Sequence, residues 1–185
     1  MRDEVVSSGS EQLILVDEND REIGVSSKTD CHLGDGVLHR AFSLFIFNDA
    51  GELLLQRRSS HKPLWPMFWS NSCCSHPREG ESMEHAVDRR LEQELGLSTD
   101  LTFLYKFVYH APYLDIGAEH EFCWVYAGQS SDVPHANVNE VDEMRYISPM
   151  QLDQEMEQDP DSFTPWFKLE WARVRELYVR EQFGL

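Results

Sequence analysis

Two apolar runs separated by a short turn constrain the fold of this chain more than any other feature. The first run covers residues 38–47 and the second covers residues 52–57, and both have the length and apolar content of buried β-strands. The connection at residues 48–51 reads Asn-Asp-Ala-Gly, which is typical of a tight turn. The sequence therefore predicts a β-hairpin at the start of a meander, and with it a sheet inside the domain.

Helices and further strands follow from the periodicity of the rest of the chain. A helix is expected up to residue 95, because Ser82 is a suitable cap, apolar residues recur at helical spacing, and Gly96 follows. Two more helices are expected near the end of the chain, where Ser148 and Thr164 each precede a proline. The remaining strands are predicted at residues 12–17, 101–110, 121–127 and 144–147.

The length and apolar content of the chain indicate one folded domain. It has 185 residues, of which 41% are hydrophobic, and this is enough to bury a core and excludes a disordered chain. We expect a single compact domain of the α/β (α+β) class at residues 11–185. Residues 1–10 are small and polar, so we expect them to form a flexible tail.

The charge distribution restricts the kinds of ligand that the protein can bind. The formal net charge is −17, which repels phosphate on average, so we expect no nucleic acid and no membrane as partner. Residues 56–90 are an exception, because they hold six basic and four acidic side chains, whereas residues 91–161 hold two basic and fifteen acidic ones. An anionic ligand is therefore expected to bind near residues 56–90.

Two further features indicate a soluble protein of the cytoplasm. The N-terminus has no basic region followed by an apolar run, and no apolar stretch approaches the roughly 20 residues that cross a bilayer. The four cysteines include an adjacent pair but no Cys-x-x-Cys motif, so they predict neither a disulfide framework nor a zinc ribbon. The oligomeric state stays open at this point.

The segment at residues 69–77 carries the most chemical information. It reads Trp-Ser-Asn-Ser-Cys-Cys-Ser-His-Pro, and its polar residues and proline argue against a central strand or a helix. Cys74 and His76 project to the same side if the chain is extended there. A thiol beside an imidazole can serve as a nucleophile, as a base or as a metal site, and the alternative is a free cysteine buried as a small apolar residue.

Other histidines and glutamates could join His76 in a metal site. His32 and His39 lie around two glycines before a predicted strand, and Glu119 and Glu121 share one face of another strand. Three imidazoles and two carboxylates suit a five- or six-coordinate divalent ion such as Mn, Mg, Fe or Zn. The alternative is that the histidines cap strand ends and the glutamates are solvated.

The helix at residues 82–95 resembles a degenerate Nudix box. The frame is present at Ser75, which stands for the first glycine, and at Glu81, Arg89, Leu91, Gly96 and Leu97. Arg90 and Gln93 replace two glutamates that hold catalytic cations in Nudix hydrolases, which leaves Glu94 and Glu81. Hydrolysis becomes the less expected chemistry. Without a functional role, Arg90 and Glu94 would form an ion pair on an exposed helix face.

Taken together, the motifs of residues 12–180 resemble type I isopentenyl diphosphate isomerases, which have a degenerate Nudix fold. The resemblance implies a Nudix-like mixed β-sheet sandwich flanked by helices. It rests on His32 and His39 in the glycine-bearing loop and on Leu-His-Arg-Ala-Phe at 38–42, Gln-Arg-Arg at 56–58, Trp-Pro at 65–66, the segment 69–77, Glu-Leu-Gly at 94–96, Tyr109, Glu-His-Glu at 119–121 and Thr-Pro-Trp at 164–166.

This resemblance implies the residues of a metal site and of a catalytic pair. A first divalent ion, Mn, Zn or Mg, is held by His32, His39, His76, Glu119 and Glu121. The catalytic pair is Cys74 and Glu121, with Tyr109 assisting the glutamate and Trp166 as an aromatic lid. Trp65 and Trp69 either close the apolar pocket or belong to the core.

A diphosphate site is implied by the same resemblance. A second cation, Mg, is held by Glu94, the main-chain carbonyl of Cys74 and the substrate. The positions that bind the diphosphate in the family are Lys28, Arg58, Lys62 and Arg90.

The implied function is the interconversion of isopentenyl and dimethylallyl diphosphate, which supplies isoprenoid biosynthesis. The double bond is protonated to a tertiary carbocation, and a proton is then lost from C2. We expect Glu121 to deliver the first proton and the Cys74 thiolate to remove the second. Two alternatives stay open, a Nudix-type diphosphate hydrolase and a catalytically inactive binding protein on the same fold.

Overall fold

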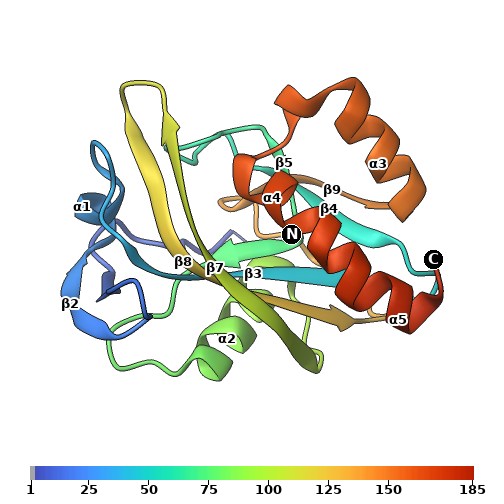
Figure 1. The fold of residues 1–185 in the computed structure, drawn as a ribbon, viewed down its shortest axis with the longest axis horizontal. Coiled ribbons are helices and arrows are strands. Elements are labelled where there is room, and N and C mark those ends of the chain that lie inside the picture. The colour runs from blue at the N-terminus through green and yellow to red at the C-terminus, as the bar shows by residue number, and fades with distance from the viewer. Residues whose placement is uncertain (1–2) are drawn as a thin grey trace.

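The computed structural model describes residues 3–185, which form one mixed α/β fold around a nine-stranded sheet (Figure 1). The strands are β1 (Gln12–Val16), β2 (Glu22–Ser27), β3 (His39–Phe47), β4 (Leu53–Arg58), β5 (Trp69–Ser70), β6 (Cys73–Ser75), β7 (Leu101–Tyr113), β8 (Gly117–Gln129) and β9 (Val141–Ile147). The helices are α1 (Lys28–His32), α2 (Met83–Leu95), α3 (Pro149–Gln158), α4 (Pro165–Val174) and α5 (Arg180–Phe183), with a 3-10 turn at Pro160–Ser162 and a π-helical stretch at Arg175–Val179. The expected mixed sheet with flanking helices is confirmed.

Strand β3 connects most of the sheet. It runs parallel to β8 from the pair His39 and Glu121 to the pair Phe47 and Gln129. It is also antiparallel to β6, where Ser43 lies opposite Cys74, and to β1 at a single pair. Because the two partners of β3 that carry predicted site residues are far apart in sequence, its pairing brings distant functional groups together.

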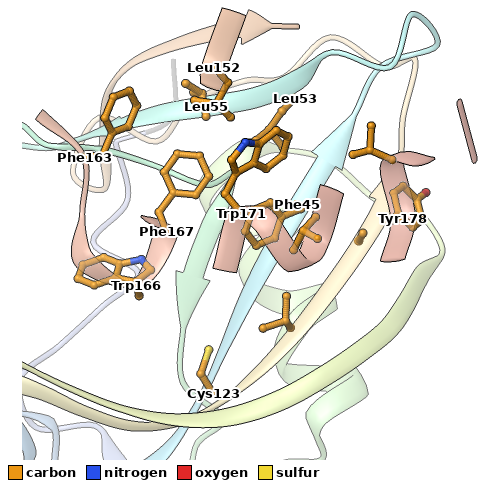
Figure 2. Packing of buried hydrophobic residues seen from close by; sticks show 14 of the residues in the cluster. Phe45, Leu53, Leu55, Cys123, Leu152, Phe163, Trp166, Phe167, Trp171 and Tyr178 are labelled. Atoms are coloured by element: carbon orange, nitrogen blue, oxygen red, sulfur yellow. The ribbon is translucent and has the colours of Figure 1, made fainter. Parts of the chain in front are cut away.

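The two faces of β3 explain why it lies in the centre. Phe42, Leu44 and Ile46 face a cluster of buried side chains that includes residues of α2. Phe45 and Phe47 face the opposite cluster, which Figure 2 shows around Trp171, Phe167 and Leu152. Alternate side chains of a strand point to opposite faces, so a strand that is apolar on both faces must be covered on both. In the structure α2 covers one face, and α4 with its continuation covers the other.

The predicted hairpin forms at its turn, but its two strands stay paired over a short stretch. Gly51 adopts a φ of 75°, and the Asn48 side chain accepts hydrogen bonds from two main-chain N–H groups of the turn. The strands then separate after the single pair Phe47 and Leu53, and β4 pairs along its length with β9. The edges of β3 are occupied by β8 and β6, so β4 completes its hydrogen bonds elsewhere.

The expectation that residues 69–77 contain no central strand is wrong. They contribute β5 and β6, and β6 pairs with β3 at the centre of the sheet. Polar side chains in this segment form hydrogen bonds with main-chain groups of β3 and β4. Ser72 Oγ donates to the carbonyl of Leu54 and accepts from the N–H of Ile46. The Asn71 amide donates to the carbonyl of Leu44. Buried polar side chains are tolerated there because each has partners.

Besides β5 and β6, the strand β2 and the helix α1 have no counterpart in the sequence prediction. The apolar residues of β2, Ile23 and Val25, are both exposed, because β2 is an edge strand whose only named strand partner is β1. Helix α1 has five residues, and Ser27 caps it by accepting from the N–H of Asp30. Elements so short or so exposed carry little hydrophobic periodicity. The three predicted helix starts are confirmed: Ser82 and Ser148 cap their helices through the side chain, and Thr164 occupies the N-cap position without a side-chain capping hydrogen bond.

The first two residues of the predicted flexible tail lie outside the described residues. The others, residues 3–10, form no helix or strand but lie against the domain. Val6 is buried, and main-chain carbonyls of the segment accept hydrogen bonds from Arg90, Asn137 and Asn139. The flexibility of the tail stays a prediction. None of the helices formed by residues 3–185 combines the length and apolarity that a membrane crossing requires.

Candidate active site

Three histidines and two glutamates from four parts of the chain meet at one end of the β3–β8 pair. One potential ligand atom from each lies within 4.8 Å of those from the others. His32 ends α1, His39 begins β3, His76 follows β6, and β8 contributes two glutamates on the same face. The five residues are His32, His39, His76, Glu119 and Glu121. This is the set that the sequence predicted, and the structure brings all of it together.

The histidine rings are oriented as metal ligands usually are. His32 Nδ1 lies 2.7 Å from the carbonyl of Lys28, and His39 Nδ1 lies 2.7 Å from that of Val37. A carbonyl oxygen only accepts hydrogen bonds, so each Nδ1 must carry a proton, and in the neutral ring Nε2 then offers a lone pair. His39 Nε2 is buried without a hydrogen-bond partner. A divalent ion would satisfy that lone pair, and carbonyl partners on the other ring nitrogen are the common support of such ligands.

The electrostatics of the cluster also fit a bound cation. Burial and the neighbouring His32 lower the pKa of His39 to about 3, and burial with the other two histidines lowers the pKa of His76. Burial and the nearby Glu119 raise the pKa of Glu121 well above its usual value. Glu119 Oε2 lies 2.9 Å from His32 Nε2, although not in hydrogen-bond geometry. Against the effect of burial, Glu119 raises the pKa of His32 and His32 lowers the pKa of Glu119, so these two groups form a charge pair in the structure. A divalent ion would supply the positive charge that the His32 proton supplies here.

Glu121 is held by two side chains besides its possible metal contact. Tyr109 lies opposite it in the β7–β8 ladder, and the Tyr109 hydroxyl donates to Glu121 Oε2 at 2.6 Å. His76 Nε2 lies 2.9 Å from Oε1 of the same carboxyl group. Burial and then Glu121 raise the pKa of Tyr109 well above its usual value, so the hydroxyl stays protonated and can donate.

Cys74 is surrounded by polar groups that the sequence did not point to. Its thiol donates to Asn71 Oδ1 at 2.9 Å, and the indole N–H of Trp166 approaches the sulfur at 3.2 Å. The Ser43 hydroxyl lies 3.7 Å from the sulfur on the neighbouring strand. Burial, and then the carboxyl group of Glu170, raise the pKa of Cys74 to about 12. The cysteine is therefore a neutral thiol in the absence of ligands.

A cavity of about 530 Å³ joins the two predicted catalytic residues. Cys74, Tyr109, Glu121 and Trp166 all contribute to its wall, together with metal-site residues and cationic side chains. Its volume is in the range of small-molecule sites, which is roughly 300–1,000 Å³. Trp65 does not line it but packs edge-on against Trp166, with ring centroids 5.3 Å apart.

The side chains predicted to bind the diphosphate already form ion pairs or hydrogen bonds with other groups of the protein. Lys28, Arg58 and Lys62 line the cavity. Lys62 forms an ion pair with Glu140, which the sequence did not single out because it lies in a polar loop without periodicity. Burial, followed by Lys62 and Arg90, lowers the pKa of Lys28 to about 8.

Two of the hydrogen-bond donors of Arg58 are used within the protein. Its guanidinium donates to the carbonyls of Leu64 and Trp65, and it lies over the Trp166 ring at 5.1 Å from the centroid. One face of the Trp166 indole is therefore already in contact with a cation. Trp69 lies farther out between Arg57 and Arg145, whose guanidinium groups are 5.7 and 4.5 Å from its ring centroid.

Arg90 and Glu94 do not lie on the cavity wall. They form the i,i+4 ion pair considered from the sequence, but the pair is buried, since each residue is 1% exposed, and the exposed-face alternative is wrong. Arg90 also donates to the carbonyl of Val6 and lies 3.4 Å from Glu140. Oε1 of Glu94 is engaged by Arg90, and Glu94 is not a member of the five-residue metal cluster. The predicted second cation site at Glu94 and the main-chain carbonyl of Cys74 stays a prediction.

Comparisons with known proteins agree with this geometry. The model of the NUDIX domain family matches residues 37–167. Among solved structures, DR0079 from Deinococcus radiodurans superposes with a TM-score of 0.71 at 24% identity, covering 91% of this chain and 99% of that one. A MutT NUDIX hydrolase from Burkholderia pseudomallei gives a TM-score of 0.59 at 20% identity, covering 74% and 98%. These likenesses define the class, a protein with the Nudix fold.

Sequence relatives define the group within that class. Isopentenyl-diphosphate Delta-isomerase 1 of Photorhabdus laumondii is 45% identical over 89% of this chain and 94% of its own length. Isopentenyl-diphosphate Delta-isomerase of Pectobacterium atrosepticum is 42% identical over 90% and 93%. The chain belongs to the NUDIX domain family and, within it, to the family of the isopentenyl-diphosphate Delta-isomerases. The resemblance inferred from the motifs is thus confirmed.

Proposed function

We propose that this protein interconverts isopentenyl diphosphate and dimethylallyl diphosphate and so supplies isoprenoid biosynthesis. The observation that carries the proposal is that a thiol, Cys74, and a carboxyl group, Glu121, share one cavity beside a cluster suited to a divalent ion. The reaction needs one acid and one base around the same three-carbon unit. Its full-length relatives carry the name of this enzyme.

In this proposal, Glu121 and Cys74 exchange protons with the substrate. Glu121, supported by the Tyr109 hydroxyl, gives a proton to the terminal methylene carbon and leaves a tertiary carbocation. Cys74 reacts as the thiolate: it takes a proton from C2 and becomes the neutral thiol, and the electrons of that C–H bond form the new double bond. The two residues change roles in the reverse direction, so each cycles between a protonated and a deprotonated form. Trp166 and the apolar wall keep water away from the cation.

Trp166 has two contacts that bear on its role. Its N–H is shared between the Ser70 hydroxyl at 3.1 Å and the Cys74 sulfur at 3.2 Å, and at the sulfur it would favour the thiolate that acts in the reaction. Arg58 covers one face of its indole, so the carbocation is expected to meet the other face. A cation–π contact of this kind contributes about 2 kcal/mol or more in a desolvated site.

The cofactors are part of the proposal. The three histidines and two glutamates hold a first divalent ion, for which Mn, Zn and Mg are the candidates, and this ion supplies positive charge that tunes Glu121. Mg bound with the substrate diphosphate by Glu94 and the Cys74 carbonyl remains a prediction that requires Glu94 to exchange its contact with Arg90. The expected absence of nucleic-acid and membrane partners stays a prediction.

The cytoplasm is the proposed location. All four cysteines are free thiols, which is the usual state in a reducing compartment. The substrate is a small allylic or homoallylic diphosphate, which the basic side chains around the cavity are suited to bind.

One experiment separates the isomerase from the two alternatives. The protein is incubated with isopentenyl diphosphate and Mg in deuterated water, and the substrate is followed by NMR. We expect deuterium incorporation and formation of the dimethylallyl isomer. Release of phosphate would instead favour a Nudix hydrolase, and metal-loaded protein that turns over no diphosphate would indicate a binding protein.

Two adjacent cysteines provide a matched pair of variants for the same assay. Cys74→Ala is expected to abolish isomerisation, because its sulfur lies on the cavity wall. Cys73→Ala is expected to retain it, because the Cys73 side chain packs in the opposite cluster with α2. Equal activity of both variants would contradict the assignment of Cys74 as a proton-transfer group.

A further inference from the structure

The segment before β1 forms one wall of the cavity. Val5, Ser7 and Gly9 line the cavity, whereas Val6 is buried against the domain. This alternation is typical of an extended chain, in which successive residues face opposite sides. The segment lies outside the NUDIX family match at residues 37–167, and the sequence predicts a flexible tail there. The sequence motifs therefore gave no indication of this wall.

Contacts on both sides of Ser7 hold the segment in place. The carbonyl of Val6 accepts a hydrogen bond from the Arg90 guanidinium at 2.8 Å. The carbonyl of Gly9 accepts from the main-chain N–H of Thr29 in α1 at 3.0 Å. The segment passes so close to α1 that a Cβ atom added at Gly9 would lie 2.4 Å from the Thr29 hydroxyl oxygen. Ser7 is therefore held at a defined place on the cavity wall.

The Ser7 hydroxyl contacts a cation of the cavity wall. Lys28 Nζ donates to Ser7 Oγ at 2.5 Å, and both residues line the cavity. An ammonium group has no lone pair, so Ser7 accepts in this bond and its own proton is not used. Within residues 3–185, that proton has no acceptor. The hydroxyl can therefore still donate one hydrogen bond beside a cation.

The other cations of the wall leave a use for such a donor. Arg58 already donates to two main-chain carbonyls, and Lys62 is paired with Glu140. A diphosphate carries several oxygens that accept hydrogen bonds, and each of them needs a donor once water is excluded. A phosphate oxygen that binds the Lys28 ammonium lies within reach of the Ser7 hydroxyl, because the two groups are in contact.

We infer that Ser7 is a diphosphate-binding residue, whose hydroxyl donates to the phosphate oxygen that Lys28 also binds. The inference rests on the proposed function, because it takes the substrate diphosphate to lie against Lys28. Hydrogen bonds to a charged acceptor are about twice as strong as those between neutral groups, so one hydroxyl contributes measurably to affinity. Among the described contacts of Ser7 there is none with Cys74 or Glu121, so the residue acts on binding and not on proton transfer.

Calorimetric titration with inorganic diphosphate and Mg tests this contact without requiring turnover. Ser7→Ala should weaken diphosphate binding about tenfold, whereas Ser7→Thr keeps a hydroxyl and should stay within about threefold of the wild type. Ser8→Ala is the matched control and should bind as the wild type does, because Ser8 is exposed and its hydroxyl contacts that of Ser10. In the isomerase assay, Ser7→Ala should raise KM about tenfold and leave kcat within about twofold.

A Lys28→Met background separates direct binding from an effect through the lysine. If Ser7 donates to the diphosphate itself, adding Ser7→Ala to Lys28→Met should weaken diphosphate binding by a further factor of about three or more. The inference is overturned if the wild type binds no diphosphate, if Ser7→Ala binds it as tightly as the wild type or more tightly, or if the second substitution has no effect in the Lys28→Met background. Wild-type protein that binds diphosphate but isomerises no isopentenyl diphosphate would instead refute the proposed function and leave the binding test unaffected.

Discussion

Replacing Glu170 with glutamine should stabilise the protein, and the gain should depend on pH. The carboxyl group is fully buried, and burial raises its pKa from 4.5 to about 8. The folded state therefore keeps the proton in a pH range where the unfolded chain releases it. Glutamine has nearly the same shape as the protonated acid and cannot ionise, so it lacks this penalty.

The size of the effect follows from the two pKa values. The stability contributed by Glu170 is complete below pH 4.5 and decreases as the pH rises toward about 8, because the unfolded state loses its proton first. Each pH unit in that interval corresponds to about 1.4 kcal/mol. The glutamine variant should therefore gain about 3 kcal/mol of unfolding free energy at pH 7 and under about 1 kcal/mol at pH 5.

Urea denaturation of both proteins at pH 5, 6, 7 and 8 measures this difference. All other titrating groups are shared by the two proteins, so their contributions cancel in the comparison. Glu157→Gln on the exposed face of α3 is the control for the change in charge, and its difference from the wild type should stay within about 0.5 kcal/mol. A Glu170→Gln difference that is the same at pH 5 and pH 8 would refute the reasoning, because it would mean that Glu170 is ionised in the folded state.

Three further predictions concern the catalytic pair, the metal cluster and the core. Tyr109→Phe should lower kcat about tenfold or more with little change in KM, since its hydroxyl donates to Glu121 at 2.6 Å; unchanged kcat would exclude that assistance. Chelation of divalent ions should lower the melting temperature measured by calorimetry, because the cluster of three histidines and two glutamates loses its compensating charge, and Mn should restore it; equal melting curves would argue against a bound ion. Leu44→Ala, at a fully buried position, should cost about 2–5 kcal/mol in urea denaturation, and a cost below 1 kcal/mol would contradict the close packing between β3 and α2.

The sequence was informative wherever a local pattern carries the structural information. Ser82 and Gly96 delimit α2 because capping depends on neighbouring main-chain groups. The five metal-cluster residues were identified by their types and by the motifs around them, and all five meet in the structure. Their meeting could not be derived from spacing, since it depends on which strands pair.

The pairing of β3 shows where local reasoning stops. The turn at residues 48–51 joins β3 and β4 in an antiparallel pair as predicted, but it gives no information on the parallel pairing of β3 with β8 across more than 80 positions of sequence. Periodicity tells which face of a strand is buried but not which strand lies beside it. The same limit applies to Asn71, Ser43 and Glu170, whose residue types are ordinary in polar segments and amphipathic helices.

The sequence by itself determined the longer helices and strands, the domain class and the chemical groups of the candidate site. Only the tertiary structure decided that His39 lies opposite Glu121, that Arg90 and Glu94 form a buried pair, and that Glu170 lies without a cation behind Cys74. The physical reason is that hydrogen-bond partners and burial depend on segments distant in sequence. Burial and hydrogen-bond partners together set the pKa values of the side chains, and those pKa values decide which groups of a site can give or take a proton.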